Sequence, residues 1–231
     1  MRTIGMIGGV TWHSTLDYYR IINETVHREL GGEHSARLVM HSVEFAELRT
    51  AQRTGGWPAV LSMLNEAVAG LKAAGAEGLV LGANTLHIIA DDLAQASGLP
   101  VIHVADAVGA AARARGLARL GLLGTDVTMA ERFYHERLAG EWGLEVLVPE
   151  EPDATRLSDL IYDELVRGRF EDDGRALCLG IMADLAGRGA DGMILGCTEL
   201  PILLEGHAGP VPCLDTLALH AEAAARWSLA P

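Results

Sequence analysis

The chain has 231 residues and a mass of 24.5 kDa, enough for one large domain or two small ones with hydrophobic cores. Its net charge of −13 argues against nucleic-acid binding, because neutralising phosphates requires a basic surface. No apolar run approaches the roughly 20 residues of a membrane span, and the N-terminal apolar stretch is too short for a signal peptide. We therefore expect a cytoplasmic protein.

Short apolar runs alternate with longer helical patterns, which is typical of a parallel α/β sheet. Because the short runs are almost entirely Val, Leu, Ile and Met, we expect strands that are buried on both faces. The predicted strands are residues 2–7, 37–42, 78–81, 101–103, 119–123, 144–148, 192–195 and 211–214. The predicted helices are residues 14–30, 57–74, 107–115, 129–141, 155–167, 175–187 and 217–227.

The two halves of the chain repeat one pattern. The segment AGAEGLVLGANTLHII from Ala74 aligns without a gap with RGADGMILGCTELPIL from Arg188, so Ala83 corresponds to Cys197, 197 − 83 = 114 residues later. Two further pairs match at a similar spacing, TIGMIGGVT with RLGLLGTDVT and GLPVIHVAD with GPVPCLDTL. The repeat predicts two pseudo-symmetric lobes, each a parallel sheet flanked by helices.

We place the first lobe at residues 1–105, with the C-terminal helix 216–231 packing back on it, and the second at residues 106–215. Ligands of parallel sheets bind beyond the carboxyl ends of the strands. We therefore expect the active site in the crevice between the lobes, with Ala83 and Cys197 facing each other across it.

Cys197 is the cysteine whose surroundings indicate chemistry. It follows a predicted strand through Gly196 and precedes a predicted helix start, where backbone N–H groups and the positive helix end would favour a thiolate. A buried strand-end cysteine is the structural alternative. Cys178 and Cys213 are expected to pack in the core, and none of the three shows the spacing of a disulfide framework or a zinc site.

Polar residues after the equivalent strand of the first half form a candidate anion cradle. Asn84, Thr85 and the first-turn N–H groups could hold a carboxylate, although both side chains are also ordinary helix caps. Arg53, beside Gln52, could meet a substrate carboxylate or be a solvated loop arginine. His87 lies one turn after Ala83, as a polar group of the site or a histidine satisfied by local hydrogen bonds.

No cofactor is expected. The Gly8-Gly9 turn belongs to neither GxxxxGK[ST] nor GxGxxG, so a nucleotide cofactor is not indicated. The nine histidines show no metal-ligand spacing, so we expect no metal.

The motifs GMIGGVTWHST, GGEHSARLVMHSVEF, ANTLH, HVAD, GLLGTDVTM and GCTELP, in order along the whole chain, resemble the aspartate/glutamate racemase family, specifically its aspartate or broad-specificity amino-acid racemase branch. The resemblance implies PLP-independent, cofactor-independent racemisation by two bases, and a homodimer. It assigns one base to Cys197 and the other, a cysteine or threonine in the family, to the position of Ala83. The implied substrate-binding residues are Val10, Gln52, Arg53, Asn84, Thr85, Leu86, Thr125, Thr198 and Glu199.

Ala83 departs from that pattern, because a methyl group neither accepts nor donates a proton. Losing a positioned acid or base typically costs about 10²–10⁴-fold in rate. The leading interpretation is an amino-acid racemase in which Cys197 is the thiol acid/base and activity is weak or one-sided. The alternatives are a cofactor-free, single-cysteine decarboxylase of malonate-type acids, similar to the arylmalonate decarboxylases, and a ligand-binding pseudoenzyme.

Overall fold

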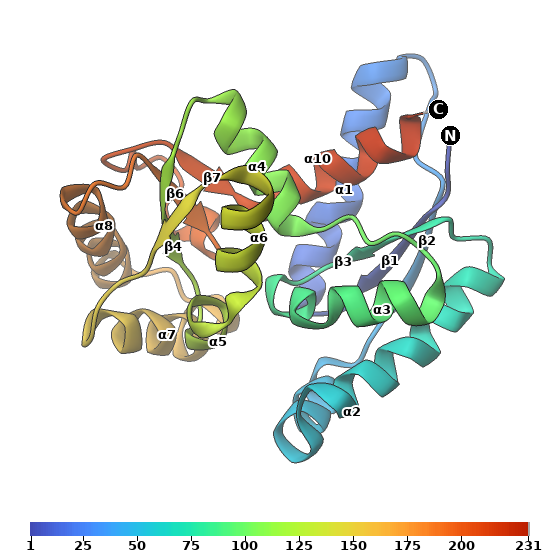
Figure 1. Cartoon of the computed structure of the whole chain (residues 1–231), viewed down its shortest axis with the longest axis horizontal. Coiled ribbons are helices and arrows are strands. Elements are labelled where there is room, and N and C mark those ends of the chain that lie inside the picture. The colour runs from blue at the N-terminus through green and yellow to red at the C-terminus, as the bar shows by residue number, and fades with distance from the viewer. Residues whose placement is uncertain (231) are drawn as a thin grey trace. The chain divides into compact units, whose positions relative to one another are not determined.

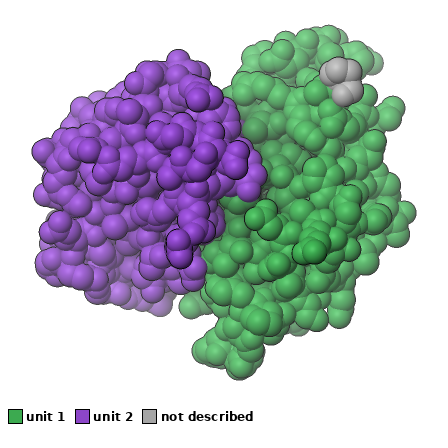
Figure 2. Space-filling view, in the orientation of Figure 1, with its two compact units in different colours: residues 1–103, 220–231 green, residues 104–219 purple. Residues whose placement is uncertain are grey.

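The chain divides into two compact units, shown in separate colours in Figure 2. The computed structural model describes residues 1–230. Unit 1 comprises residues 1–103 together with the chain from His220, and unit 2 comprises residues 104–219.

Unit 1 contains a three-stranded parallel sheet in the order β2-β1-β3 (Figure 1). Ile4 is in register with Leu38 on one side and Gly78 on the other. Val101 adds an isolated parallel bridge to Leu79. The elements are β1 (Ile4–Gly8), α1 (Trp12–Leu30), β2 (Leu38–Ser42), α2 (Phe45–Ala73), β3 (Gly78–Leu81), the 3-10 helix η1 (Asn84–Ile89) and α3 (Ala90–Ser97).

Unit 2 contains a four-stranded parallel sheet in the order β5-β4-β6-β7. Its strands are β4 (Arg119–Leu123), β5 (Glu145–Leu147), β6 (Gly192–Leu195) and β7 (Cys213–Asp215). Its helices are α4 (Val104–Ala114), α5 (Asp126–Ala130), α6 (Arg132–Trp142), α7 (Asp153–Asp163), η2 (Leu165–Arg167), α8 (Asp172–Gly187) and α9 (Leu200–Leu203). The last helix, α10 (Thr216–Leu229), begins in unit 2 and continues into unit 1.

The two sheets share one topology. In each unit the first strand lies in the middle, the second pairs on one side, the third pairs on the other, and every pairing is parallel. The Val101 bridge beyond β3 takes the place of β7 beyond β6. The predicted α/β class, with two parallel sheets flanked by helices, is confirmed.

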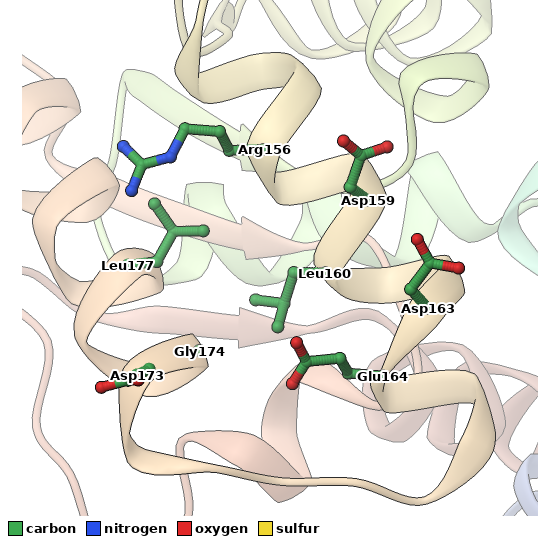
Figure 3. A pocket seen from close by; sticks show the side chains of 8 residues that line it. All are labelled: Arg156, Asp159, Leu160, Asp163, Glu164, Asp173, Gly174 and Leu177. Carbon is green, nitrogen blue, oxygen red and sulfur yellow. The ribbon is translucent and has the colours of Figure 1, made fainter.

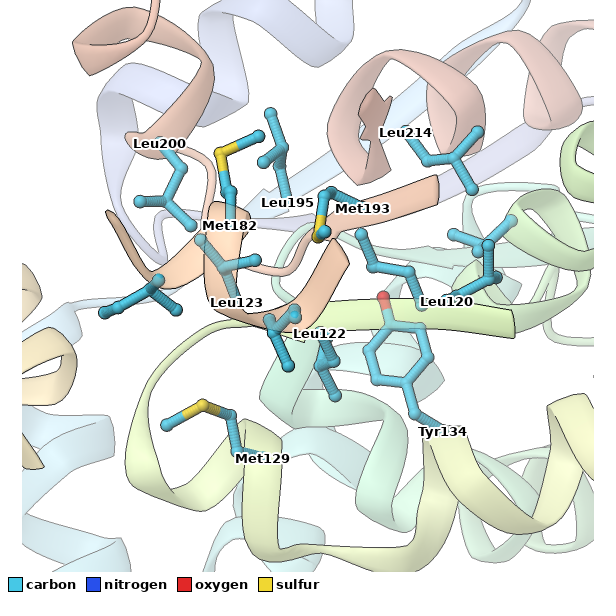
Figure 4. Packing of buried hydrophobic residues seen from close by; sticks show 14 of the residues in the cluster. Leu120, Leu122, Leu123, Met129, Tyr134, Met182, Met193, Leu195, Leu200 and Leu214 are labelled. Carbon is cyan, nitrogen blue, oxygen red and sulfur yellow. The ribbon is translucent and has the colours of Figure 1, made fainter. Parts of the chain in front are cut away.

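Aliphatic residues of the central strands form the cores. In unit 2, side chains from β4 and β6 pack with Tyr134 of α6, Met182 of α8 and Leu200 of α9 (Figure 4). Strands β1, β3 and β6 are buried at every residue, as the apolar runs predict. The prediction is wrong for β2, which is exposed from Met40 to Ser42, because it is the edge strand of its sheet.

Helix α10 is tied to the start of the chain. The ring of Trp227 fills the space above Gly78, where a Cβ atom would overlap it. The Arg2 guanidinium lies 4.5 Å from the centre of the same ring, and the Arg2 N–H donates to the carbonyl of Ser228 over 2.8 Å. A cation–aromatic contact and backbone pairing therefore hold the helix against unit 1.

Three predicted elements differ from the structure. Residues 101–103 form a single bridge at Val101 instead of a strand. The predicted helix 129–141 is two helices, α5 and α6, because the extended backbone of Glu131 separates them. Helix α2 begins at Phe45, capped by the Glu44 side chain, and so includes a stretch predicted as a loop; Gly56, with φ 65°, interrupts it.

The predicted helix 155–167 is also divided, into α7 and η2, at Glu164. Beyond these differences, the predicted elements match the observed ones to within a few residues at each end. Among the helices of residues 1–230, none combines the length and the apolar character needed to cross a membrane.

The turns after β3 and β6 are built by the same contact. The N–H of Gly82 donates to the Ile7 carbonyl over 2.8 Å, and the N–H of Gly196 donates to the Leu123 carbonyl over 2.7 Å. A Cβ atom at either glycine would lie 2.8 Å from the same carbonyl oxygen. Each turn therefore requires glycine for close approach to the neighbouring strand.

We predict that Gly196→Ala destabilises the protein by about 1–3 kcal/mol, because the new methyl group overlaps backbone that cannot move aside. Gly180→Ala is the matched control. Gly180 lies in α8, and a methyl group added there would meet no other part of the chain within 4 Å, so alanine should stabilise the helix by about 0.5–1 kcal/mol. Urea denaturation followed by circular dichroism measures both effects; equal stability of the two variants would contradict the prediction.

Candidate active site

The turn of unit 2 presents a thiol, a hydroxyl and a carboxylate in consecutive residues. The Cys197 thiol donates a hydrogen bond to Oε2 of Glu199 over 3.0 Å, and the Thr198 hydroxyl donates to the same oxygen over 2.7 Å. Cys197 and Thr198 are partly buried, and Glu199 is 9% exposed. Buried Leu200 follows and anchors this short turn in the core.

The prediction that Cys197 is a thiolate is wrong for this structure. Burial raises the pKa of Cys197 well above its usual value, and the negative charge of Glu199 and the hydrogen bond to it raise it further. The backbone N–H of Glu199 acts in the opposite direction but is outweighed. Helix α9, from which the sequence predicts a positive helix end, is a single turn of four residues. The resting group is therefore a protonated thiol beside a carboxylate.

The equivalent turn of unit 1 presents Ala83, Asn84 and Thr85. Ala83 has an extended backbone and immediately precedes η1, and both Ala83 and Asn84 are 9% exposed. The Nδ1–H group of His87 lies 3.1 Å from the Ala83 carbonyl and 3.2 Å from the Asn84 carbonyl. Because both partners are acceptors, Nδ1 carries the proton. His87 thus fixes the backbone of this turn through local hydrogen bonds, which is one of the two roles considered for it from the sequence.

His87 belongs to a buried cluster of three histidines. Its ring centre lies 4.7 Å from that of His103 and 5.1 Å from that of His220. His220 donates through Nε2 to the Ile102 carbonyl over 2.6 Å and accepts at Nδ1 from the Tyr18 hydroxyl over 2.8 Å. His87 Nε2 is buried without a hydrogen-bond partner. With its proton on Nδ1, the neutral His87 ring therefore has an unpaired acceptor, Nε2, in the protein interior.

Burial sets the charge of this cluster. It lowers the pKa of His87 well below the usual value, and the neighbouring His103 and His220 lower it further. Burial also lowers the pKa of His220 to about 4. Both rings are consequently neutral at physiological pH.

The other predicted site residues lie on the turns after the first strands and on α2. Val10 is partly buried in the turn after β1, and Thr125 is 8% exposed in the turn after β4, where its hydroxyl accepts from the Thr128 N–H over 3.2 Å. Gln52 is partly buried and Arg53 is exposed, both on α2 instead of a loop. Leu86 is 1% exposed and packs in the core of unit 1.

No pattern in the sequence points to the partners of His87. His103, His220 and Tyr18 come from distant parts of the chain, so no local spacing connects them. The HVAD motif at residues 103–106 contains one of these histidines, but the motif alone indicates no role for its ring.

The remaining cysteines have no polar partner that would activate them. Cys178 is fully buried in the core of unit 2, and burial raises its pKa to about 12. Cys213 is partly buried on β7, and burial raises its pKa as well. Within residues 1–230 no group of three or more His, Cys, Asp and Glu side chains is placed to hold a metal ion.

A separate pocket of about 360 Å³ lies between α7 and α8 (Figure 3). Its rim is acidic, with Asp159, Asp163, Glu164 and Asp173 around Leu160. None of the residues predicted from the sequence lines it. We therefore base the candidate site on the two strand-end turns.

The two parallel sheets flanked by helices, with glycine-closed turns at their strand ends, match the fold of solved racemase structures. The sequence profile of the Asp/Glu/hydantoin racemase family matches residues 7–224, and the chain belongs to that family.

Two solved structures are similar over their whole length. A proposed Asp/Glu racemase from Yersinia pestis is 40% identical, with a TM-score of 0.94 and all of both chains covered. An aspartate racemase homologue from Pyrococcus horikoshii is 32% identical, with a TM-score of 0.84 and the same coverage. The Gly74Cys mutant of an arylmalonate decarboxylase shares the fold, at 18% identity and a TM-score of 0.54, with 98% of this chain and 93% of that chain covered.

The histidine cluster predicts loss of stability in acid. Unfolded histidines bind protons below pH about 6.5, whereas the buried rings resist protonation, so the unfolded state binds more protons and stability falls as pH falls. Full stability is expected above about pH 7.5, with a loss of about 1.4 kcal/mol per pH unit for each such histidine below about 6.5. For His220 the loss continues to its folded pKa of about 4.

Thermal unfolding between pH 8 and pH 4.5 measures this dependence. His220→Gln, which still offers a donor and an acceptor, should flatten it, whereas His27→Gln at an exposed position of α1 should leave it unchanged. An acid slope that is identical in wild type and His220→Gln would rule out the cluster as its source.

Proposed function

We propose that this chain is a cofactor-independent, PLP-independent amino-acid racemase of the aspartate/glutamate or broad-specificity type, with Cys197 as its acid/base. The observation that carries the proposal is the Cys197 thiol, hydrogen-bonded to a carboxylate at the end of a parallel strand, in a chain of the Asp/Glu/hydantoin racemase family. The full-length similarity to an aspartate racemase homologue supports a small amino acid as substrate.

The proposal takes over the residue roles that the sequence implies. Asn84, Thr85 and Thr198 hold substrate carboxylates, and the remaining predicted residues shape the site. One base position of the family falls on Cys197 and the other on Ala83, as the resemblance implies. Turns that contain Asn and Thr can bind anions through their side chains and their backbone N–H groups. This supports the role of these residues as carboxylate anchors.

The chemistry at Cys197 is proton transfer at the α-carbon. A thiolate removes the α-proton from one face of the amino acid, and the resulting thiol returns a proton to the carbanion. Ala83, which is 9% exposed and has only a methyl group, supplies no proton on the other face. We therefore expect exchange of the α-proton with solvent to exceed racemisation.

A second candidate function has one specific observation in its favour. The raised pKa of Cys197 keeps the thiol protonated, which suits delivery of a proton to a carbanion better than removal of a proton. A decarboxylase of malonate-type acids needs only that delivery, after carbon dioxide leaves. A ligand-binding pseudoenzyme, the third alternative, would show neither reaction.

We predict that Cys197→Ala abolishes α-deuterium exchange into amino acids in D₂O, with a loss of at least about 10²–10⁴-fold, because the positioned proton carrier is gone. Nuclear magnetic resonance of aspartate, glutamate and homoserine in both enantiomeric forms measures the exchange. Cys178→Ala, which removes a core thiol, is the control and should retain exchange in the fraction that folds. An equal loss from Cys178→Ala in a folded protein would contradict the assignment.

Ala83→Cys is predicted to increase racemisation, because position 83 follows the same glycine contact as Cys197 and the variant places a thiol at the position of the missing base. Ala83→Thr should give a smaller gain, since a hydroxyl is a far poorer base. Chiral chromatography of the same amino acids measures both. Release of carbon dioxide from a malonate-type acid by the wild type, with no gain in the folded Ala83→Cys variant, would favour the decarboxylase instead.

We also propose that the chain is a homodimer. Trp12, Leu16 and Tyr19 of α1 are 60%, 60% and 54% exposed, and their spacing places them in one apolar stripe. A self-complementary helix face of this kind is suited to a twofold contact between identical chains.

The dimer proposal predicts that Leu16→Glu shifts the protein to a monomer, because a charge placed in an apolar contact is costly to bury. Light scattering after size-exclusion chromatography measures the mass. Tyr162→Glu, at an exposed aromatic position of α7, should leave the mass unchanged. A wild-type mass of 24.5 kDa would refute the proposal.

A further inference from the structure

We infer that Glu199 is the proton acceptor of Cys197, so that the two side chains share one proton and the thiolate forms only when Glu199 takes that proton. This gives Glu199 a different role from the substrate anchor that the sequence implies. The inference rests on the proposed function for its catalytic part, whereas the shared proton is a property of the free protein.

The contacts of Glu199 carry the inference. Its Oε2 atom receives both the Cys197 thiol at 3.0 Å and the Thr198 hydroxyl at 2.7 Å. The Glu199 side chain, 9% exposed, therefore folds back over its own turn instead of extending into solvent. Because the thiol and the hydroxyl both donate to this one oxygen, the resting proton lies on sulfur.

Two negative charges cannot both persist in this turn. A thiolate and a carboxylate 3.0 Å apart in a partly buried site repel each other strongly, so that one proton is retained between them. The titratable side chains that act on Cys197 are Glu199 and, from α8, Cys178, and both raise its pKa. Neither a lysine nor an arginine is among the groups that shift it. The partner that can remove the thiol proton is consequently Glu199.

The proton balance follows from the hydrogen bond between the two side chains. The pair Cys–SH and Glu–COO⁻ converts to Cys–S⁻ and Glu–COOH by transfer along that bond. The thiolate then takes the α-proton of the substrate and becomes a thiol, leaving a carbanion, with Glu199 protonated. Return of a proton from the thiol to the same face regenerates the substrate. Before that return, Glu199 releases its proton to solvent, accepts the proton from sulfur and passes back solvent deuterium, so the event is visible as α-deuterium.

This arrangement explains how a chain with a methyl group at position 83 could still turn over the α-proton. Both the accepting and the donating steps use one thiol and its carboxylate, on one face of the substrate. The expected product is the starting enantiomer carrying deuterium. Racemisation, which requires delivery to the other face, is not a product of this pair.

The test compares Glu199→Gln with Glu205→Gln, which removes the same charge from an exposed position six residues later. The rate of Cys197 alkylation by iodoacetamide is followed from pH 6 to pH 11 by peptide mass spectrometry. In Glu199→Gln the midpoint should fall by at least one pH unit, giving about tenfold faster alkylation at neutral pH, because the repelling charge is gone. Glu205→Gln should match the wild type.

The catalytic rate of Glu199→Gln should fall, although its Cys197 thiol is alkylated faster. Glu199→Gln should lose about 10²-fold or more in α-deuterium exchange although more of its Cys197 is thiolate, because no carboxylate remains to carry the α-proton from sulfur to solvent and to return deuterium. Glu199→Asp, which keeps the carboxylate, should retain part of the exchange. A faster-reacting thiol with weaker catalysis is a combination that loss of a substrate anchor or of stability does not produce.

Several outcomes overturn the inference. An unchanged alkylation midpoint in Glu199→Gln, or a raised KM with unchanged kcat, would return Glu199 to a binding role. In the wild type, a midpoint of Cys197 alkylation below pH 8.5 would show that the thiolate is present in the free protein. This measurement does not depend on the folding of any variant. Absence of exchange in the wild type with a shifted midpoint in Glu199→Gln would remove the racemase proposal and leave the shared proton intact.

Discussion

The candidate site depends on a backbone contact that excludes any side chain. At the end of the third strand of each unit, a glycine N–H reaches the carbonyl of the first strand, from Gly82 to Ile7 and from Gly196 to Leu123. The distance left for a Cβ atom is shorter than atoms tolerate. The following residue, Ala83 or Cys197, therefore comes directly after a glycine-closed strand end in both units. Both units close this strand end with a glycine, but the next side chain is a methyl group in one and a thiol in the other.

The turns after β3 and β6 differ in the groups that carry their protons. In unit 1 the turn is held by a neutral histidine, His87, whose Nδ1–H group bonds two carbonyls, and burial, with a smaller effect of the neighbouring rings, lowers the pKa of His87. In unit 2 the turn holds a thiol and a carboxylate around one proton. The turn of unit 1 therefore contains a neutral, hydrogen-bonded histidine, whereas the turn of unit 2 contains a thiol proton beside a carboxylate. This asymmetry fits a reaction that proceeds from one face.

Much of the fold follows from the sequence because buried parallel strands are nearly continuous apolar runs. The strands after which the site residues lie, 78–81 and 192–195, have the predicted bounds for that reason. The first part of α2 could not be predicted as helix, because Gly55, Gly56 and Pro58 indicate a break and do not show that helix precedes it. Residues 101–103 are too short for periodicity to separate a strand from a single bridge.

The positions of the site residues were predictable, but their charges were not. The repeat points to Cys197 without any structure. Its pKa depends on the Glu199 side chain folding back by two residues and on α9 ending after one turn, and neither follows from residue types. The histidine cluster could not be predicted either. Its members come from four separate segments of the chain that meet only in the tertiary structure: His87, His103, His220 and Tyr18.

Helix α10 has a consequence for the order of events during synthesis. Unit 2 is one continuous stretch, residues 104–219, whereas unit 1 combines residues 1–103 with the chain from His220. The Trp227 ring over Gly78 and the Tyr18–His220 hydrogen bond can form only after residues 220–227 have been made. Although residues 1–103 are translated first, unit 1 therefore completes its core only after all of unit 2 has been made.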